Sequence, residues 1–222
     1  MHTFLSYFLK VTEILFPRTC SGCGENGSFL CNKCLDESPR ALPLSEVPSA
    51  FTTAIFNYRH PAIRRAIWRF KYENARDIAT HFGRPLYDEI IGEVGNDLRI
   101  ASGIVFLLVP IPLHPKRLRE RGYNQSELLS REILNHDTED MFELVPGALA
   151  RTRQTKPQAK KEKRVARFEN LRGAFLSSPQ LVHGRHVILI DDVTTTGATL
   201  SEARKSLLKA GAKTVRAYTV AH

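Results

Sequence analysis

Two runs of this sequence are apolar at nearly every position: GIVFLLVPIP at residues 103–112 and HVILI at 186–190. A strand with one face in water would alternate apolar and polar residues, so these runs predict strands buried on both faces. They stand among segments whose apolar residues recur at helical intervals. The expected fold is therefore α/β, with a mostly parallel sheet covered on both faces.

The other elements follow from the same patterns. Strands are predicted over residues 51–58 and 214–221, and residues 61–94 are predicted to form two helices broken near Gly83 to Pro85. A helix over 124–135 has Asn124 as its expected N-cap, with Glu127 three positions on. The helix over 198–210 is expected to end at Gly211.

The sequence VILIDDVTTTGATL, at residues 187–200, places Asp191 and Asp192 at the end of a buried strand. In parallel sheets ligands bind beyond the carboxyl ends of the strands. The following turn leads into a helix whose N-terminal amides favour anions, and Thr195, Thr196 and Thr199 add hydroxyl donors. Two carboxylates beside an anion site need vicinal hydroxyls or a Mg2+ ion, and a ribose 5-phosphate meets every requirement. The alternative is a plain strand-to-helix turn.

All four cysteines, Cys20, Cys23, Cys31 and Cys34, form two C-x2-C pairs within fifteen residues. This spacing is typical of a structural zinc ion held by four thiolates, in a small ribbon that depends on the metal. Four thiolates leave no open position for catalytic water. The rivals are two disulfides or a redox pair; disulfides would require an exported chain, for which the N-terminus gives no support.

The net charge of +9 is concentrated. Residues 151–172 carry nine Lys or Arg against two Glu, and residues 114–125 carry four against one. Such patches attract phosphate groups of nucleic acids or small polyanions. We find no apolar run long enough to span a membrane, and predict that residues 1–16 form an amphipathic helix packed on the body.

The run from Val187 to Leu200 resembles the 5-phosphoribosyl 1-pyrophosphate (PRPP) motif of type I phosphoribosyltransferases. In that family the paired acids hold the ribose 2- and 3-hydroxyls and the following loop holds the 5-phosphate. The resemblance assigns Asp191 and Asp192 to the ribose. It assigns the phosphate to Thr194, Thr195, Thr196, Gly197, Ala198 and Thr199. Thr194 departs from the pattern, which more often has an aliphatic residue there.

A wider resemblance covers nearly the whole chain from Cys20. The cysteine pairs and the PRPP motif, with the segments WRFKYENARDIA (68–79), VPIPLHPKRLRERGYNQSELL (109–129), RTRQTKPQ (151–158) and RFENLRGAF (167–175), resemble in order the ComF family. The resemblance implies a cytoplasmic competence protein that handles single-stranded DNA during natural transformation. Taken with the residue patterns, it predicts four parts: an N-terminal helix (1–16), a zinc ribbon (17–38), a linker (39–50) and a phosphoribosyltransferase-like domain (51–222).

Further site residues follow from this resemblance. Pro112, Leu113 and His114 are expected to offer backbone amides to pyrophosphate, although a structural proline-rich turn explains them equally well on sequence alone. Arg121 and Lys116 are expected to neutralise the diphosphate, with Mg2+. The basic segment looks like the flexible loop that closes over PRPP, where Arg153 or Lys156 would stabilise the leaving pyrophosphate. No convincing general base is found.

Two functions remain open. The chain is either a phosphoribosyltransferase, or a scaffold that retains a PRPP pocket while binding single-stranded DNA or DNA-uptake and recombination proteins. The residues predicted to contact nucleic acid are Lys116, Arg117, Lys160, Lys161, Lys163 and Arg164. The basic segment offers only Phe168 for base stacking, so sequence-specific recognition is not expected. Lys71 and Tyr72 are expected to be packing residues with exposed polar tips.

The ribose assignment makes one structural demand. The two acids must face an open site at the tip of their strand. Acids turned inward into salt bridges, with no cavity there, would contradict the assignment.

Overall fold

The computed structural model describes residues 17–42, 51–95, 103–152 and 171–222. The predicted N-terminal helix at residues 1–16 lies outside the described residues, as does most of the basic segment. Among the described residues no helix is both long enough and apolar enough to cross a bilayer.

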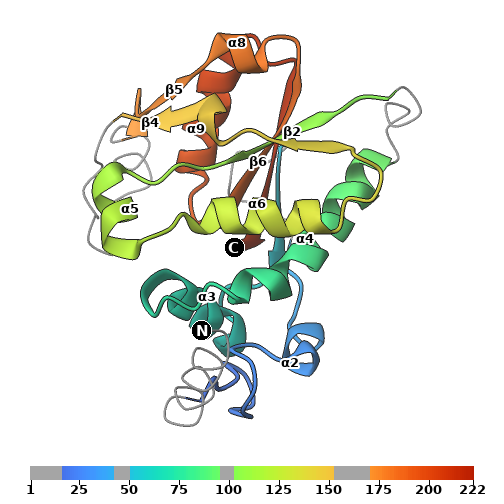
Figure 1. The fold of residues 1–222 in the computed structure, drawn as a ribbon, viewed down its shortest axis with the longest axis vertical. Coiled ribbons are helices and arrows are strands. Elements are labelled where there is room, and N and C mark those ends of the chain that lie inside the picture. Colours follow the sequence, from blue (N-terminus) through green and yellow to red (C-terminus); the bar gives the residue numbers. More distant parts are fainter. Residues whose placement is uncertain (1–16, 43–50, 96–102, 153–170) are drawn as a thin grey trace, which may run out of the picture.

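A five-stranded parallel sheet forms the centre of the molecule (Figure 1). Its order is β1 (Thr52–Phe56), β7 (Thr214–Ala221), β6 (His186–Val193), β2 (Phe106–Pro110) and β3 (Phe142–Leu144). Every neighbouring pair in this sheet is parallel. The expected mostly parallel α/β fold is therefore confirmed. A second, antiparallel sheet pairs β4 (Leu149–Arg151) with β5 (Phe175–Ser177).

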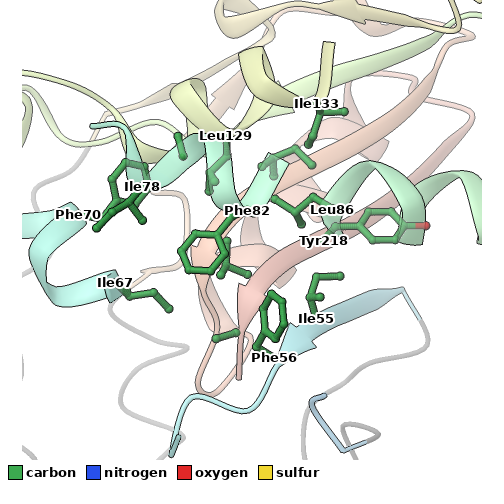
Figure 2. Packing of buried hydrophobic residues seen from close by; sticks show 14 of the residues in the cluster. Ile55, Phe56, Ile67, Phe70, Ile78, Phe82, Leu86, Leu129, Ile133 and Tyr218 are labelled. Atoms are coloured by element: carbon green, nitrogen blue, oxygen red, sulfur yellow. The ribbon is translucent and has the colours of Figure 1, made fainter. Parts of the chain in front are cut away.

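The two faces of the sheet contribute to two separate hydrophobic clusters. Phe106, Leu108, Ile188 and Ile190 pack with α3 (Pro61–Tyr72), α4 (Ile78–Gly95) and α6 (Gln125–Asn135). Figure 2 shows part of this cluster, including Phe82 and Leu86 of α4, Leu129 and Ile133 of α6, and Tyr218 of β7. The alternate positions of β2 and β6 pack with α9 (Ala198–Lys209). Burial on both faces explains why these strands lack polar alternation.

The short helices complete the fold. They are α2 (Asn32–Asp36), α5 (Pro115–Arg121), α8 (Pro179–Val182) and the 3-10 turn η2 (Pro146–Ala148). The predicted helix start at Asn124 is confirmed, since its side chain accepts a hydrogen bond from the backbone N–H of Ser126 at 3.2 Å. The backbone at Gly211 has φ of +93°, and α9 ends two residues before it.

The predicted helix break near Gly83 to Pro85 is wrong. The chain leaves the helix after Tyr72 and turns through Asn74, whose φ is +54°, whereas Pro85 lies inside α4. Gly83 is there because α6 packs against it: a Cβ at this position would approach the Cβ of Glu132 to 2.5 Å. Packing of the buried face of α4 therefore outweighs the hydrogen bond that Pro85 removes.

The cysteine segment is attached to the main body rather than separate from it. Leu30 and Leu35 are buried in the same cluster as Ile63 and Phe70 of α3. The expected ribbon is reduced to one antiparallel bridge between Thr19 and Asn26, followed by α2. Residues 39–41, at the start of the expected linker, hydrogen-bond to the end of β1.

Candidate active site and metal centre

The candidate site lies where β6 and β2 reach the same edge of the sheet. Pro110 of β2 pairs with Ile190 of β6, and the N–H of Ile111 donates to the carbonyl of Ile190 at 2.9 Å. Strand β6 continues past this point, because Asp191 and Val193 still pair with β7. The two acids therefore belong to the strand itself, at the level where the segment after β2 departs.

The surroundings of Asp191 disfavour the charged form of its carboxyl group. Burial and the neighbouring charge of Asp192 raise its pKa to about 7, against the opposing effect of Lys71. One of its oxygens accepts hydrogen bonds from the Ser126 hydroxyl at 3.0 Å and from the N–H of Asp192 at 2.9 Å. Asp191 is thus held in place, yet carries a proton more readily than a surface aspartate.

Asp192 forms an ion pair with Lys71, the penultimate residue of α3. The Lys71 Nζ lies 2.8 Å from an Asp192 carboxylate oxygen, and the two side chains are 19% and 11% exposed. Burial acts to lower the pKa of Lys71, but the charge and hydrogen bond of Asp192 outweigh it and raise this pKa. The pair is therefore charged and largely shielded from water.

Both acids turned inward into salt bridges would contradict the ribose assignment. The structure shows this for one of them, Asp192. Asp191 has Ser126 and its neighbour's amide as partners, but no direct ion pair within the described residues. Sequence reasoning treated Lys71 as a packing residue and did not consider Ser126 as part of the site. Both lie far from Asp192 in the chain, so no local spacing could have placed them there.

The threonine turn after β6 leads into the N-terminus of α9, as the sequence predicts. Thr194 is buried and its N–H donates to the carbonyl of Ala221 at 3.1 Å. Gly197 is the N-cap of α9 with φ of +71°, a conformation that favours glycine, and it provides no side-chain cap. The first-turn N–H groups of a helix have no intrahelical acceptors, so this end of α9 favours an anion.

The segment after β2 reaches the same edge, and its side chains have structural partners. His114 is the N-cap of α5, where its Nδ1 accepts from the N–H of Lys116 at 3.2 Å. Arg121 donates to Gln125 at 3.0 Å, and its guanidinium lies 5.3 Å from the centre of the Tyr72 ring. Pro112 and Leu113 lie between these elements and are partly exposed.

Arg151 adds positive charge near Asp191. Burial lowers the pKa of Arg151, as does the charge of Arg117, while the charge of Asp191 acts in the opposite direction. Lys116 is exposed on α5. The remaining predicted cations, namely Arg153, Lys156, Lys160, Lys161, Lys163 and Arg164, lie outside the described residues.

The four cysteines form one compact cluster. Their Sγ atoms all lie within 4.8 Å of one another, and those of Cys23 and Cys31 are 3.8 Å apart. A tetrahedral ion with metal–sulfur bonds of about 2.3 Å requires sulfur atoms about 3.8 Å apart. The cluster therefore has the size of a four-thiolate metal site such as that of zinc.

The backbone around the cluster favours thiolates. The N–H groups of Gly22 and Cys31 both point to the Cys20 sulfur at 3.3 Å. Burial alone would raise the pKa of Cys20, but these amides lower it to about 6. A Cβ at Gly22 would approach the Cys34 sulfur to 2.4 Å, so the close turn requires glycine. These residues fit a metal ion as their common partner.

Comparison with known proteins agrees with this architecture. A phosphoribosyl transferase domain matches residues 137–222. DNA utilization protein YhgH of Escherichia coli O157:H7 is 30% identical over 210 residues, which cover 90% of this chain and 82% of that protein. The chain belongs to the ComF family.

Two further relatives are named as competence proteins. Competence protein F of Haemophilus influenzae is 28% identical over 91% of this chain and 83% of its own length. Competence protein ComFC of Bacillus subtilis is 30% identical over 75% of this chain and 62% of its own length. The ComF resemblance seen in the sequence is therefore confirmed, together with a phosphoribosyltransferase domain and a cysteine cluster able to hold a metal.

Proposed function

We propose that the edge formed by Asp191, Asp192 and the N-terminus of α9 binds PRPP. The observation that carries the proposal is the direct succession of two carboxylates and a glycine-capped helix start, at the same sheet edge as the segment after β2. Carboxylates accept hydrogen bonds from the ribose hydroxyls, and helix amides and threonine hydroxyls donate to the 5-phosphate. ComF-family membership with a role in DNA uptake supports this reading.

The pairing of Asp192 with Lys71 is compatible with sugar binding. A carboxylate has two oxygens with about four acceptor positions, and a single lysine occupies one of them. In the unliganded protein, the positive charge of Lys71 also offsets the cost of holding the Asp192 charge away from water. We therefore assign Lys71 and Ser126 to positioning the two acids.

Chemistry at this site would be displacement of pyrophosphate from the ribose anomeric carbon by a nitrogen or other nucleophile of an acceptor, whose new bond to that carbon replaces the broken bond to the pyrophosphate oxygen. Mg2+ bound with the diphosphate would neutralise its negative charge, and the carboxylates of Asp191 and Asp192 would hold the ion. Pro112, Leu113, His114 and Arg121 are proposed to face the pyrophosphate. Arg153 and Lys156 are proposed to stabilise its leaving charge.

Calorimetry with PRPP and Mg2+ tests the proposal. The wild-type protein should bind, and Asp191→Asn combined with Asp192→Asn should remove binding because the sugar hydroxyls lose both charged acceptors. Asp88→Asn, which alters an exposed pair with Arg84, is the matched control and should bind normally. Undiminished binding by the double variant contradicts the assignment. Pyrophosphate release with a panel of nucleobases and amines then tests transfer.

A second candidate is a scaffold that binds PRPP without turnover and holds single-stranded DNA or DNA-uptake and recombination proteins in the cytoplasm. Lys116 and Arg117 on α5 favour a polyanion, and the relatives are named for DNA use and competence. In this role Lys160, Lys161, Lys163 and Arg164 would contact phosphates. DNA affinity should then fall steeply with salt and weaken on charge reversal at these four positions. Salt-independent binding contradicts it.

The cysteine cluster is proposed to hold structural zinc. Metal analysis of gently purified protein should give one zinc per chain. A zinc content near zero, or thiols oxidised in pairs, would contradict this assignment.

A further inference from the structure

Two large aromatic side chains are exposed side by side on α3. Trp68 is 52% exposed and Tyr72 is 62% exposed. They lie one helical turn apart, with ring centres separated by 5.7 Å and planes inclined by 46°. No other aromatic residue is among the exposed large hydrophobic residues in the described part of the chain. Adjacent exposed rings rimmed by polar residues are typical of an interaction site, whereas single exposed hydrophobic side chains are common and carry no such meaning.

The opposite face of α3 already provides its packing. Ala62, Ile63, Ala66, Ile67 and Phe70 are all buried in the main core. Trp68 and Tyr72 fall between these positions and project away from that core, so folding does not require an aromatic residue at either place. The rings therefore need an explanation outside the core.

Positive charge surrounds the exposed rings. Arg64 and Arg65 lie one turn before Trp68, both exposed, and no acidic side chain in the described residues pairs with either. Arg121, from α5, lies over the Tyr72 ring. The nearby acid Glu73 is engaged by Arg69 at 3.4 Å. We name Arg64, Arg65, Trp68, Tyr72 and Arg121 the α3 aromatic face.

A hollow continues this face toward the cysteine cluster. It has a volume of about 400 Å³ and is lined by Arg65 and His60 from the start of α3, with Cys23, Cys34 and the acid Glu37 on the other side. At the far end, Tyr72 directly follows Lys71, the partner of Asp192. A helix of this length spans about 18 Å, so one extended ligand could lie along it from the cluster to the sheet edge.

We propose that the α3 aromatic face binds single-stranded DNA, with bases stacked on Trp68 and Tyr72 and phosphates near Arg64, Arg65 and Arg121. This inference rests on the nucleic-acid role proposed above and gives it a location. Aromatic rings interleaved with arginines form a stacking surface that accepts any base sequence. Duplex DNA keeps its bases stacked on each other and offers them no access to this face. The face supplies the aromatic groups that the basic segment lacks.

Trp68 is the chain's single tryptophan, so its fluorescence reports on this face directly. The full-length protein is titrated with an oligothymidylate of about 20 nucleotides. Stacking should quench the tryptophan emission in step with binding measured by the anisotropy of a labelled copy. An oligonucleotide of equal length with abasic sites keeps the phosphates but has nothing to stack, and should bind about tenfold more weakly. The duplex should give no quenching.

Variants separate stacking from charge. Trp68→Ala should weaken oligothymidylate binding about tenfold, and Trp68→Phe should recover most of that loss, both read by anisotropy. Arg64→Ala with Arg65→Ala should lower affinity and reduce the salt dependence by about two phosphate contacts. Leu176→Ala, which removes an exposed side chain on β5, and Arg84→Ala on α4 are the matched controls and should bind normally.

The outcomes are distinguishable. If the wild type binds oligothymidylate but Trp68→Ala binds equally well, or if the abasic strand binds as tightly, the stacking face is wrong while DNA binding stands. If the wild type binds no single-stranded DNA, both the face and the nucleic-acid role fail. Calorimetry with PRPP on Trp68→Ala should match the wild type in every case, which keeps the sugar site separate from this test.

Discussion

The cysteine cluster and the acidic sheet edge differ in how far apart in the sequence their residues lie. The cluster takes all four thiols from residues 20–34. The sheet edge brings Asp191 and Asp192 together with Ser126 and Lys71, from three distant elements. The cluster is thus specified by local spacing, whereas the partners of the acids depend on the whole fold.

The two regions also differ in how their charges are balanced. Four thiols within 4.8 Å of one another cannot all ionise without a cation, because their like charges repel. The acids have an internal cation in Lys71 and a hydrogen-bond donor in Ser126. We infer that the cluster needs a bound metal ion for stability, whereas the acidic site is stable without a ligand.

Metal removal should give the largest effect on stability. Chelation should lower the melting temperature sharply, because structural zinc contributes on the order of 10 kcal/mol in small metal-folded peptides and this cluster carries Leu30 and Leu35 into the core. Thermal unfolding with and without chelator, with metal analysis, provides the measurement. Cys20→Ser is the control, on which chelation should have little further effect. An unchanged melting temperature would mean that the cluster does not depend on a metal.

Asp192→Asn should have the next largest effect, about 3 kcal/mol of lost stability, because it leaves the shielded Lys71 charge without its partner. Lys71→Met in the same chain should recover most of the loss. Urea unfolding measures both variants. Asp88→Asn, in the exposed pair with Arg84, should lose only about 0.5 kcal/mol. Equal losses at Asp192 and Asp88 would contradict the internal balance of the acidic site.

Asp191→Asn should have the smallest effect and the opposite sign. The pKa of Asp191 is raised to about 7 from 3.8 in the unfolded chain, so the folded protein holds an extra proton between about pH 4 and pH 7. Stability therefore falls as pH rises through this window and levels off above it. The variant should remove this dependence and gain on the order of 1 kcal/mol at pH 8, after loss of its charge-assisted bond to Ser126. Urea unfolding across pH measures it; a variant with the wild-type pH profile would refute the burial of this charge.

The sequence predicts the elements well where one signal dominates. The parallel sheet, the Asn124 cap and the helix before Gly211 are confirmed, because burial on both faces and capping chemistry leave local patterns. The predicted break near Gly83 fails because glycine and proline were interpreted as helix-breaking signals. In the fold, Gly83 admits α6, and packing of Phe82, Leu86 and Ile90 holds the helix through Pro85.

The sequence by itself determined the buried strands, the cysteine cluster and the position of the two acids at a strand end, since each depends on residues that are close in the chain. Only the tertiary structure decided that Lys71 neutralises Asp192, that Ser126 holds Asp191, and that Arg121 lies over the exposed Tyr72 ring. These contacts join elements that meet only when the sheet and its helices pack. A chain's local pattern fixes which groups are available, and packing fixes which of them share a low-dielectric neighbourhood where their charges interact strongly.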